Sequence, residues 1–251
     1  MNMLRTRFCV ANWKMNFNCT DTKSFLESWN NKELTNKEVK TIFCLSFTEL
    51  NTGVEILQYS DSEIGAQNVF YESNGAYTGE VSCSMLKNIG CQWVIIGHSE
   101  RRSIFSETDE MVRNKLDQLI SERMNPIVCI GETKTQRENG KTQEILSRQL
   151  SIAFENQEDI NLKNTIIAYE PVWAIGTGIT ASVEMVSDAH KSIRNIFNNN
   201  GFNGSDISIL YGGSVTDGNA TELSELIDVD GFLVGGASLD VDKFYAIYNQ
   251  L

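Results

Sequence analysis

The sequence predicts an α/β protein built as a single (β/α)8 barrel, and three observations support this. Eight short apolar runs rich in β-branched residues recur along the 251 residues, as is typical of parallel strands buried on both faces. Stretches of helical periodicity separate most of these runs, and alternating strands and helices build a parallel sheet. Eight such units in a chain of about 250 residues fit a closed barrel better than an open, doubly wound sheet.

The expected strands are too short and too uniformly apolar to be amphipathic helices. In chain order they are residues 7–12, 39–45, 62–67, 92–97, 126–131, 164–170, 206–212 and 230–236. In a parallel barrel the chemistry collects where strands end and the following loops begin. The residues just after these runs are therefore the first candidates for a functional site.

Helical character is expected for four segments, and in the first two of them apolar residues recur along one face. These segments are residues 108–122, 182–197, 216–227 and 241–251, and the evidence is weakest for 46–58. No change in composition and no low-complexity linker interrupts the chain. We therefore expect one domain over residues 1–251.

The composition argues against several classes of protein. A net charge of -12 is unsuited to nucleic acid, whose recognition needs clustered Lys and Arg. Six scattered cysteines and only two histidines predict no zinc or other metal site and suit a reducing compartment. No run approaches the roughly 20 apolar residues of a membrane span, and the first residues lack a signal peptide's apolar stretch. We expect a soluble, cytoplasmic protein.

The stretch "YEPVWAIGTGITA" (169–181) contains the spacing of a dinucleotide-binding fingerprint. The context does not fit, because five residues separate Glu170 from the first glycine and no acidic residue lies between 189 and 205. Apolar residues between a proline and two glycines instead predict a loop that closes over a site and excludes water. The predicted lid comprises Pro171, Val172, Trp173, Ala174, Ile175, Gly176, Thr177 and Gly178.

Four candidate catalytic residues follow expected strands. Asn12 and Lys14 come at the end of the first, His98 at the end of the fourth and Glu170 at the end of the sixth. Desolvation beside the apolar lid should raise the pKa of Glu170 and make it a base. His98 opens a helix-like Ser-Glu-Arg-Arg sequence, and a helix N-terminus disfavours a charged imidazole. Lys14 would supply a fixed positive charge at the mouth.

Two Gly-Gly pairs follow the seventh and eighth strands, at residues 212–213 and 235–236, and Ser214 comes next to the first pair. That part of a barrel commonly holds a phosphate through backbone N–H groups and a helix N-terminus. A base, a neutral electrophile, a fixed cation and a phosphate site together suit proton transfer beside the carbonyl of a small phosphorylated substrate.

Motifs at the strand ends resemble those of the triosephosphate isomerase family, across nearly the full length of the chain. They are "NWKMN", "IIGHSERR", "CIGET", "AYEPVWAIGTG", "YGGSV" and "GFLVGGASL". The resemblance implies a TIM barrel that interconverts dihydroxyacetone phosphate and D-glyceraldehyde 3-phosphate through an enediolate, without a cofactor. A glutamate base with a neutral histidine is the known arrangement of this family.

The resemblance also implies roles for individual residues. Glu170 would move the proton between carbons, His98 would polarise the carbonyl, and Lys14 with Asn12 would stabilise the oxyanion. Phosphate would be bound by Asn12, Lys14, Gly176, Ser214, Gly235 and Gly236.

The family is usually a homodimer, in which the loop "NGAYTGE" (74–80) would insert Thr78 near the partner's site. Three residues depart from the family pattern. Phe17 and Ser106 stand where glycine is frequent, and Ile179 stands at a lid position that is often Lys. None of the three is a predicted catalytic residue, so we expect activity to be retained and any difference to lie in how the lid moves.

Two alternatives remain at this point. One is an aldolase that forms a Schiff base at Lys14, which would need a neutral, desolvated lysine. The other is a barrel that binds without catalysis, although the presence of Glu170, His98 and Lys14 speaks against it.

Overall fold

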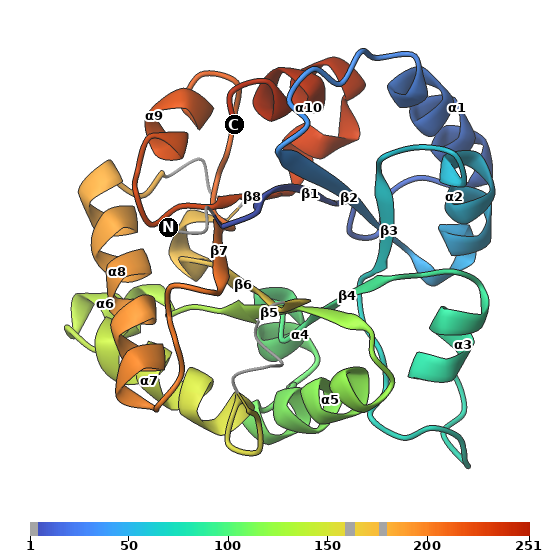
Figure 1. Cartoon of the computed structure of the whole chain (residues 1–251). Coiled ribbons are helices and arrows are strands. Elements are labelled where there is room, and N and C mark those ends of the chain that lie inside the picture. The colour runs from blue at the N-terminus through green and yellow to red at the C-terminus, as the bar shows by residue number, and fades with distance from the viewer. Residues whose placement is uncertain (1–4, 159–163, 176–179) are drawn as a thin grey trace.

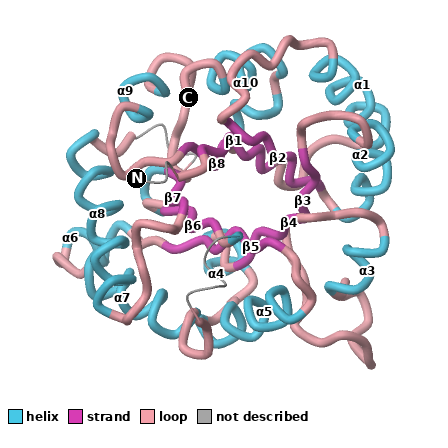
Figure 2. The backbone as a smooth tube through the Cα atoms, in the orientation of Figure 1, coloured by secondary structure: helices cyan, strands magenta, loops and turns pink. Residues whose placement is uncertain are grey.

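The computed structural model describes residues 5–158, 164–175 and 180–251. Within them, eight parallel strands close a barrel in chain order, and β8 pairs with β1. The strands are β1 (Arg7–Asn12), β2 (Val39–Leu45), β3 (Glu63–Ala66), β4 (Trp93–Ile96), β5 (Asn125–Ile130), β6 (Ile166–Tyr169), β7 (Ser208–Tyr211) and β8 (Gly231–Val234). Figures 1 and 2 show this ring of strands inside a ring of helices, which confirms the predicted fold.

The helices of the described residues lie outside the barrel. They are α1 (Cys19–Asn30), α2 (Leu50–Leu57), α3 (Cys83–Asn88), α4 (Ser99–Ile104), α5 (Asp109–Ser121), α6 (Lys134–Glu138), α7 (Thr142–Ala153), α8 (Val183–Asn199), α9 (Ala220–Ser224) and α10 (Val241–Tyr248). Short 3-10 turns are η1 (Phe47–Glu49), η3 (Val172–Ala174) and η4 (Gly236–Leu239). The expected helices at 108–122, 182–197 and 241–251 are confirmed. The one at 216–227 is much shorter, since only α9 forms there.

Alternate residues of each strand fill the inside of the barrel. Side chains along a strand point alternately to opposite faces, so residues two apart share one face. The interior cluster consists of Phe8, Val10, Ile42, Cys44, Trp93, Ile95, Ile127, Cys129, Ile166, Ala168, Leu210 and Leu233. One further step of two residues leads from Val10 to Asn12 and from Ala168 to Glu170. The period of the strands thus directs both polar side chains inward, at the mouth of the barrel.

The outward-facing residues of the strands pack against the helices. On β2, the ring of Phe43 lies 5.2 Å from Trp29 of α1 and 5.5 Å from Phe244 of α10, measured between ring centroids. All three side chains are buried. Burying such a side chain stabilises the fold by about 1.5–3 kcal/mol, and this shell of contacts holds the strand ends in place.

Two glycines let the chain turn at the mouth. Gly97 has a φ of 70°, in the left-handed region that side chains disfavour, and this turn leads from β4 to His98. At Gly131, which follows β5, a Cβ atom would lie 1.7 Å from the carbonyl oxygen of Glu170. Only glycine allows the ends of β5 and β6 to approach this closely.

Candidate active site

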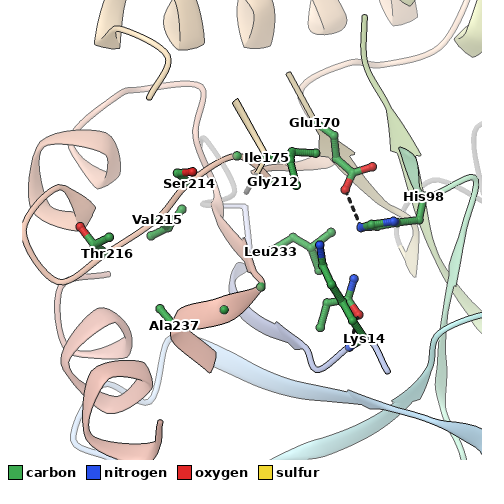
Figure 3. A pocket seen from close by; sticks show the side chains of 14 residues that line it. Lys14, His98, Glu170, Ile175, Gly212, Ser214, Val215, Thr216, Leu233 and Ala237 are labelled. Atoms are coloured by element: carbon green, nitrogen blue, oxygen red, sulfur yellow. Dashed lines mark hydrogen bonds and ion pairs between the residues drawn. The ribbon is translucent and has the colours of Figure 1, made fainter. Parts of the chain in front are cut away.

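A cavity of about 260 Å³ lies at the carboxyl ends of the strands, and Figure 3 shows the side chains around it. Its lining includes all four predicted catalytic residues. It also includes three of the predicted phosphate-binding residues, namely Ser214, Gly235 and Gly236. Gly176 lies outside the described residues. The strand-end rule selected residues that are far apart in sequence, and the structure places them around one cavity.

Glu170 is held in a buried, defined position. Its side chain is 2% exposed, and its backbone N–H donates to the carbonyl of Ile130 over 2.7 Å. One carboxylate oxygen, Oε2, accepts the backbone N–H of Ser99 at 2.9 Å. The other, Oε1, lies 2.9 Å from Nε2 of His98, the contact drawn as a dashed line in Figure 3. The carboxylate therefore faces the cavity while it is bound to the start of α4.

His98 is the N-cap residue of α4, and its ring is oriented from both sides. Nδ1 accepts the backbone N–H of Glu100 at 3.2 Å. A nitrogen that accepts a hydrogen bond carries no proton in the neutral ring, so the proton lies on Nε2, which donates to Glu170. His98 thereby presents an N–H donor toward Glu170 and the cavity.

The electrostatic expectations for this pair are corrected by the structure. Burial raises the pKa of Glu170, but the charge of His98, its hydrogen bond and the Ser99 N–H lower it further, so the net shift is downward. Burial lowers the pKa of His98, but the Glu170 charge and hydrogen bond, with Glu100, raise it above its ordinary value. The sequence predicted that the pKa of Glu170 is raised by burial and that a helix N-terminus disfavours the charged form of His98. Both expectations treated the two groups as separate, whereas the structure joins them, and both pKa shifts have the opposite direction.

Lys14 has an unusual backbone that is fixed by two amide side chains. Its φ is 53°, in the left-handed region. Its N–H donates to Oδ1 of Asn12 at 3.1 Å, and its carbonyl accepts from Nε2 of Gln67 at 2.8 Å. Its Nζ lies 2.6 Å from Oε1 of Glu100. This geometry places the Lys14 side chain at the cavity, where its Nζ is paired with a carboxylate.

The end of the cavity that the sequence predicts to bind phosphate lies opposite the pair formed by Glu170 and His98 (Figure 3). Ser214 donates its hydroxyl to the carbonyl of Ala174 over 2.8 Å. A Cβ atom at Gly235 would lie 3.5 Å from Cε of Lys14, so the glycine backbone runs close beside the lysine. A cation, a hydroxyl and glycine backbone thus meet in a space suited to a small anion.

The described part of the predicted lid, residues 171–175, is held by Glu132. The backbone N–H of Val172 donates to the carbonyl of Glu132 at 3.1 Å, and Nε1 of Trp173 donates to its carboxylate at 3.0 Å. Arg137 pairs with the same carboxylate at 3.0 Å, and its guanidinium carbon lies 5.0 Å from the Trp173 ring centroid. Residues 176–178 of the predicted lid lie outside the described residues.

Two of the three departures from the family pattern have a structural meaning. Phe17 has a φ of 67° and Ser106 a φ of 56°. Glycine adopts this left-handed conformation without strain, which is a physical reason for its frequency there. Ile179 lies outside the described residues.

Two residues around the site were missed by the reading of the sequence. Gln67 and Glu132 follow β3 and β5, so the same strand-end rule would have found them. Glu100, which the strand-end rule places beside His98, contacts both Lys14 and His98.

The second histidine, His190, does not line the cavity. His190, 0% exposed, packs edge-on against Tyr169, and burial lowers its pKa to about 4. It is therefore a packing residue, one of the two readings that the sequence allowed. In the part of the chain that the structure describes, no group of three or more His, Cys, Asp or Glu side chains is arranged to hold a metal ion. Within the same ranges, no helix has the length and apolarity needed to cross a membrane.

The fold and the cavity define a class of protein, a (β/α)8-barrel enzyme with a carboxylate and an imidazole placed for acid–base chemistry. The family model described as triosephosphate isomerase matches residues 7–251. The chain is 44% identical to the triosephosphate isomerase of Alkaliphilus oremlandii, covering 98% of this chain and 100% of that protein. It is 42% identical to that of Dictyoglomus thermophilum, covering 97% and 99%, and 41% identical to that of Flavobacterium psychrophilum, covering 99% and 100%. The chain belongs to the triosephosphate isomerase family.

Proposed function

We propose that the chain interconverts dihydroxyacetone phosphate and D-glyceraldehyde 3-phosphate, with Glu170 as the base. Family membership supports the reaction. The observation that carries the assignment of residues is the buried Glu170 carboxylate, which faces one cavity with His98, Lys14 and Asn12. Proton transfer between neighbouring carbons needs a base and a stabilised enediolate, so no cofactor is required.

The base must leave its present partners to act. Both oxygens of Glu170 are engaged, one by Ser99 and one by His98. A substrate oxygen that takes over the His98 N–H releases Oε1, and the carboxylate can then reach a substrate carbon. Loss of those hydrogen bonds and the exclusion of water both raise the pKa of a carboxylate. Substrate binding would thus turn Glu170 from a charge partner into a base.

The other three residues would act on the oxygens and the phosphate. His98 would donate its Nε2 proton to the carbonyl, and Lys14 with the Asn12 amide would stabilise the negative charge of the enediolate. Ser214, Gly235 and Gly236 would bind the phosphate, together with Gly176 from the lid. Closure of residues 171–178 would keep water from the enediolate.

The surface beside the site supports a homodimer. A second hollow of about 250 Å³ adjoins Asn12, Lys14 and His98 and is bordered by apolar side chains. Several of these are exposed in the single chain, since Met15 is 97% and Phe105 63% exposed. The loop between β3 and α3, which carries the exposed Thr78, reaches beyond the ring of helices (Figure 1). We infer that this loop fills the same hollow on a partner subunit.

We also assign the chain to one domain, residues 1–251, and to the cytoplasm. The closed barrel, in which the first strand pairs with the last, supports the first assignment. Six free cysteines, five of them buried, support a reducing compartment.

The decisive test is a coupled assay of glyceraldehyde 3-phosphate isomerisation with the wild type and Glu170→Gln. General base catalysis typically contributes 10²–10⁴-fold, so we expect kcat to fall by about that factor. Phosphoglycolate binding, measured by calorimetry, should persist in the variant. The exposed Glu138→Gln is the matched control and should keep wild-type turnover. Near-normal kcat in Glu170→Gln would mean that the base is misassigned.

The dimer is tested by Thr78→Arg. A charged, longer side chain in a filled hollow should weaken association, so sedimentation should show a lower average mass at the same protein concentration. An unchanged mass would remove this loop from the interface.

A further inference from the structure

We propose that Asn219 is a positioning residue that fixes the turn at 214–216 for the phosphate group of the substrate. The inference rests on the proposed function, because it concerns the phosphate end of the same cavity. Asn219 directly precedes α9, where an asparagine usually accepts a hydrogen bond from its own helix. Within the described residues its side chain makes no such capping bond.

The Asn219 side chain instead reaches back along the chain. Its Nδ2 donates to the carbonyl of Ser214 at 3.0 Å. Its Oδ1 accepts the backbone N–H of Thr216 at 2.8 Å and faces the Thr216 hydroxyl at 3.4 Å. One amide group therefore binds both ends of the turn and replaces the backbone hydrogen bonds that a three-residue turn lacks.

This turn forms one wall of the cavity. Ser214, Val215 and Thr216 all line it, and Figure 3 shows them across the cavity from His98. The Ser214 hydroxyl donates to the carbonyl of Ala174, so the turn also contacts the first part of the lid. A change in the turn would therefore move both the phosphate-binding groups and a lid contact.

The far side of the turn is anchored to the C-terminal part of the chain. Oε1 of Gln250 accepts the N–H and the hydroxyl of Thr221, at 3.0 and 2.7 Å. Its Nε2 donates to the carbonyls of Asp217 and Ala246, at 3.0 and 3.1 Å. Asn219 thus forms hydrogen bonds with the turn itself, while Gln250 links the residues that follow the turn to α10. A turn fixed on both sides has little freedom left to lose when it binds an anion.

The test compares Asn219→Ala with the wild type by calorimetry, using inorganic phosphate as the probe. We expect phosphate to bind roughly 10-fold more weakly, since small displacements of positioning groups have effects of this size or larger. In the coupled assay, kcat/KM for glyceraldehyde 3-phosphate should fall by a similar factor. Slow isomerisation of unphosphorylated glyceraldehyde, which lacks the group that the turn receives, should change less than twofold.

Asn198→Ala is the matched control. Oδ1 of Asn198 accepts the N–H of Gly204 at 2.9 Å, so this residue also ties a loop, but it lies at the end of α8 that leads into β7, opposite the mouth. It should leave phosphate affinity unchanged. Gln250→Ala is the second variant, to be used if Asn219→Ala does not fold, and it should weaken phosphate binding in the same direction.

The outcomes separate this inference from the proposed function. Unchanged phosphate affinity in Asn219→Ala overturns the inference, and so does an equal loss with glyceraldehyde, which would indicate a merely structural role. A wild-type protein that binds phosphate but does not isomerise glyceraldehyde 3-phosphate overturns the proposed function, while the calorimetric comparison still tests Asn219.

Discussion

Ser106→Gly should stabilise the protein, although it removes a side chain. Ser106 is exposed and has a φ of 56°. The left-handed conformation costs an L-residue about 1–2 kcal/mol, and glycine avoids this strain. Glycine in turn destabilises the folded state by about 0.5–1 kcal/mol, because it gives the unfolded chain more conformational freedom. The strain term is the larger, so the free energy of unfolding should rise by about 0.5–1 kcal/mol, which corresponds to roughly 2 °C in Tm.

The same substitution at Phe17 should have the opposite sign. Its backbone is equally strained, with a φ of 67°. However, its ring packs edge-on against Trp13 at 4.7 Å and lies 5.8 Å from Phe25. An aromatic pair contributes about 0.5–1.5 kcal/mol in addition to the burial of the ring. These contacts outweigh the relief of strain, so Phe17→Gly should destabilise the protein by roughly 1–2 kcal/mol.

The assay is urea unfolding at one protein concentration, because association changes apparent stability. Gln58→Gly is the control. Gln58 is exposed with a φ of -55°, so only the entropy term applies and the midpoint should fall. If Ser106→Gly and Gln58→Gly shift the midpoint in the same direction, the argument from backbone strain is refuted.

Two further predictions concern the catalytic pair and the close approach of β5 and β6. The two histidines can be titrated separately by NMR. The pKa of His98 should lie above its ordinary value in the wild type and should fall in Glu170→Gln, where burial still lowers it and only Glu100 still raises it, while the pKa of His190 stays near 4. A histidine whose pKa is raised by folding stabilises the fold at pH values below its ordinary pKa, near 6.5. The stability of the wild type relative to Glu170→Gln should therefore fall as pH rises through the folded pKa of His98. An unchanged His98 pKa in the variant would contradict this reasoning. Gly131→Ala should lower the free energy of unfolding by at least about 3 kcal/mol, because the added Cβ would lie 1.7 Å from the carbonyl oxygen of Glu170. If the variant unfolds at the same urea concentration as the wild type, the ends of β5 and β6 can move apart without cost and the prediction is wrong.

Much of the fold could be predicted because buried parallel strands have a simple sequence pattern. All eight apolar runs became strands, and their alternation even explains why Glu170 points inward. Helix α1 was not predicted. Its buried face consists of Thr22, Phe25, Leu26 and Trp29, and a polar residue in the apolar stripe weakens the helical pattern. The segment 216–227 failed for another reason: residues 216–219 form a backbone turn before α9, in which the N–H of Asn219 donates to the carbonyl of Thr216 at 3.2 Å.

The site was predicted as a set of residues but not as a set of contacts. The strand-end rule found His98 and Glu170 separately. Their contact depends on how β4 and β6 are placed by closure of the barrel, and this contact reverses the expected direction of both pKa shifts. Asn219 could not have been found, because an asparagine before a helix is ordinarily a cap.

Closure of the barrel between its first and last strands has a consequence for synthesis on the ribosome. Phe8 of β1 pairs with Gly231 of β8, so β1 has an open hydrogen-bonding edge until nearly the whole chain has emerged. At roughly 5–20 residues per second, that interval lasts tens of seconds. An unpaired apolar strand is a template for aggregation. The nascent chain therefore carries this open edge until β8 is made, and Gly235 and Gly236, which we propose bind the substrate's phosphate, are the last part of the site to be synthesised.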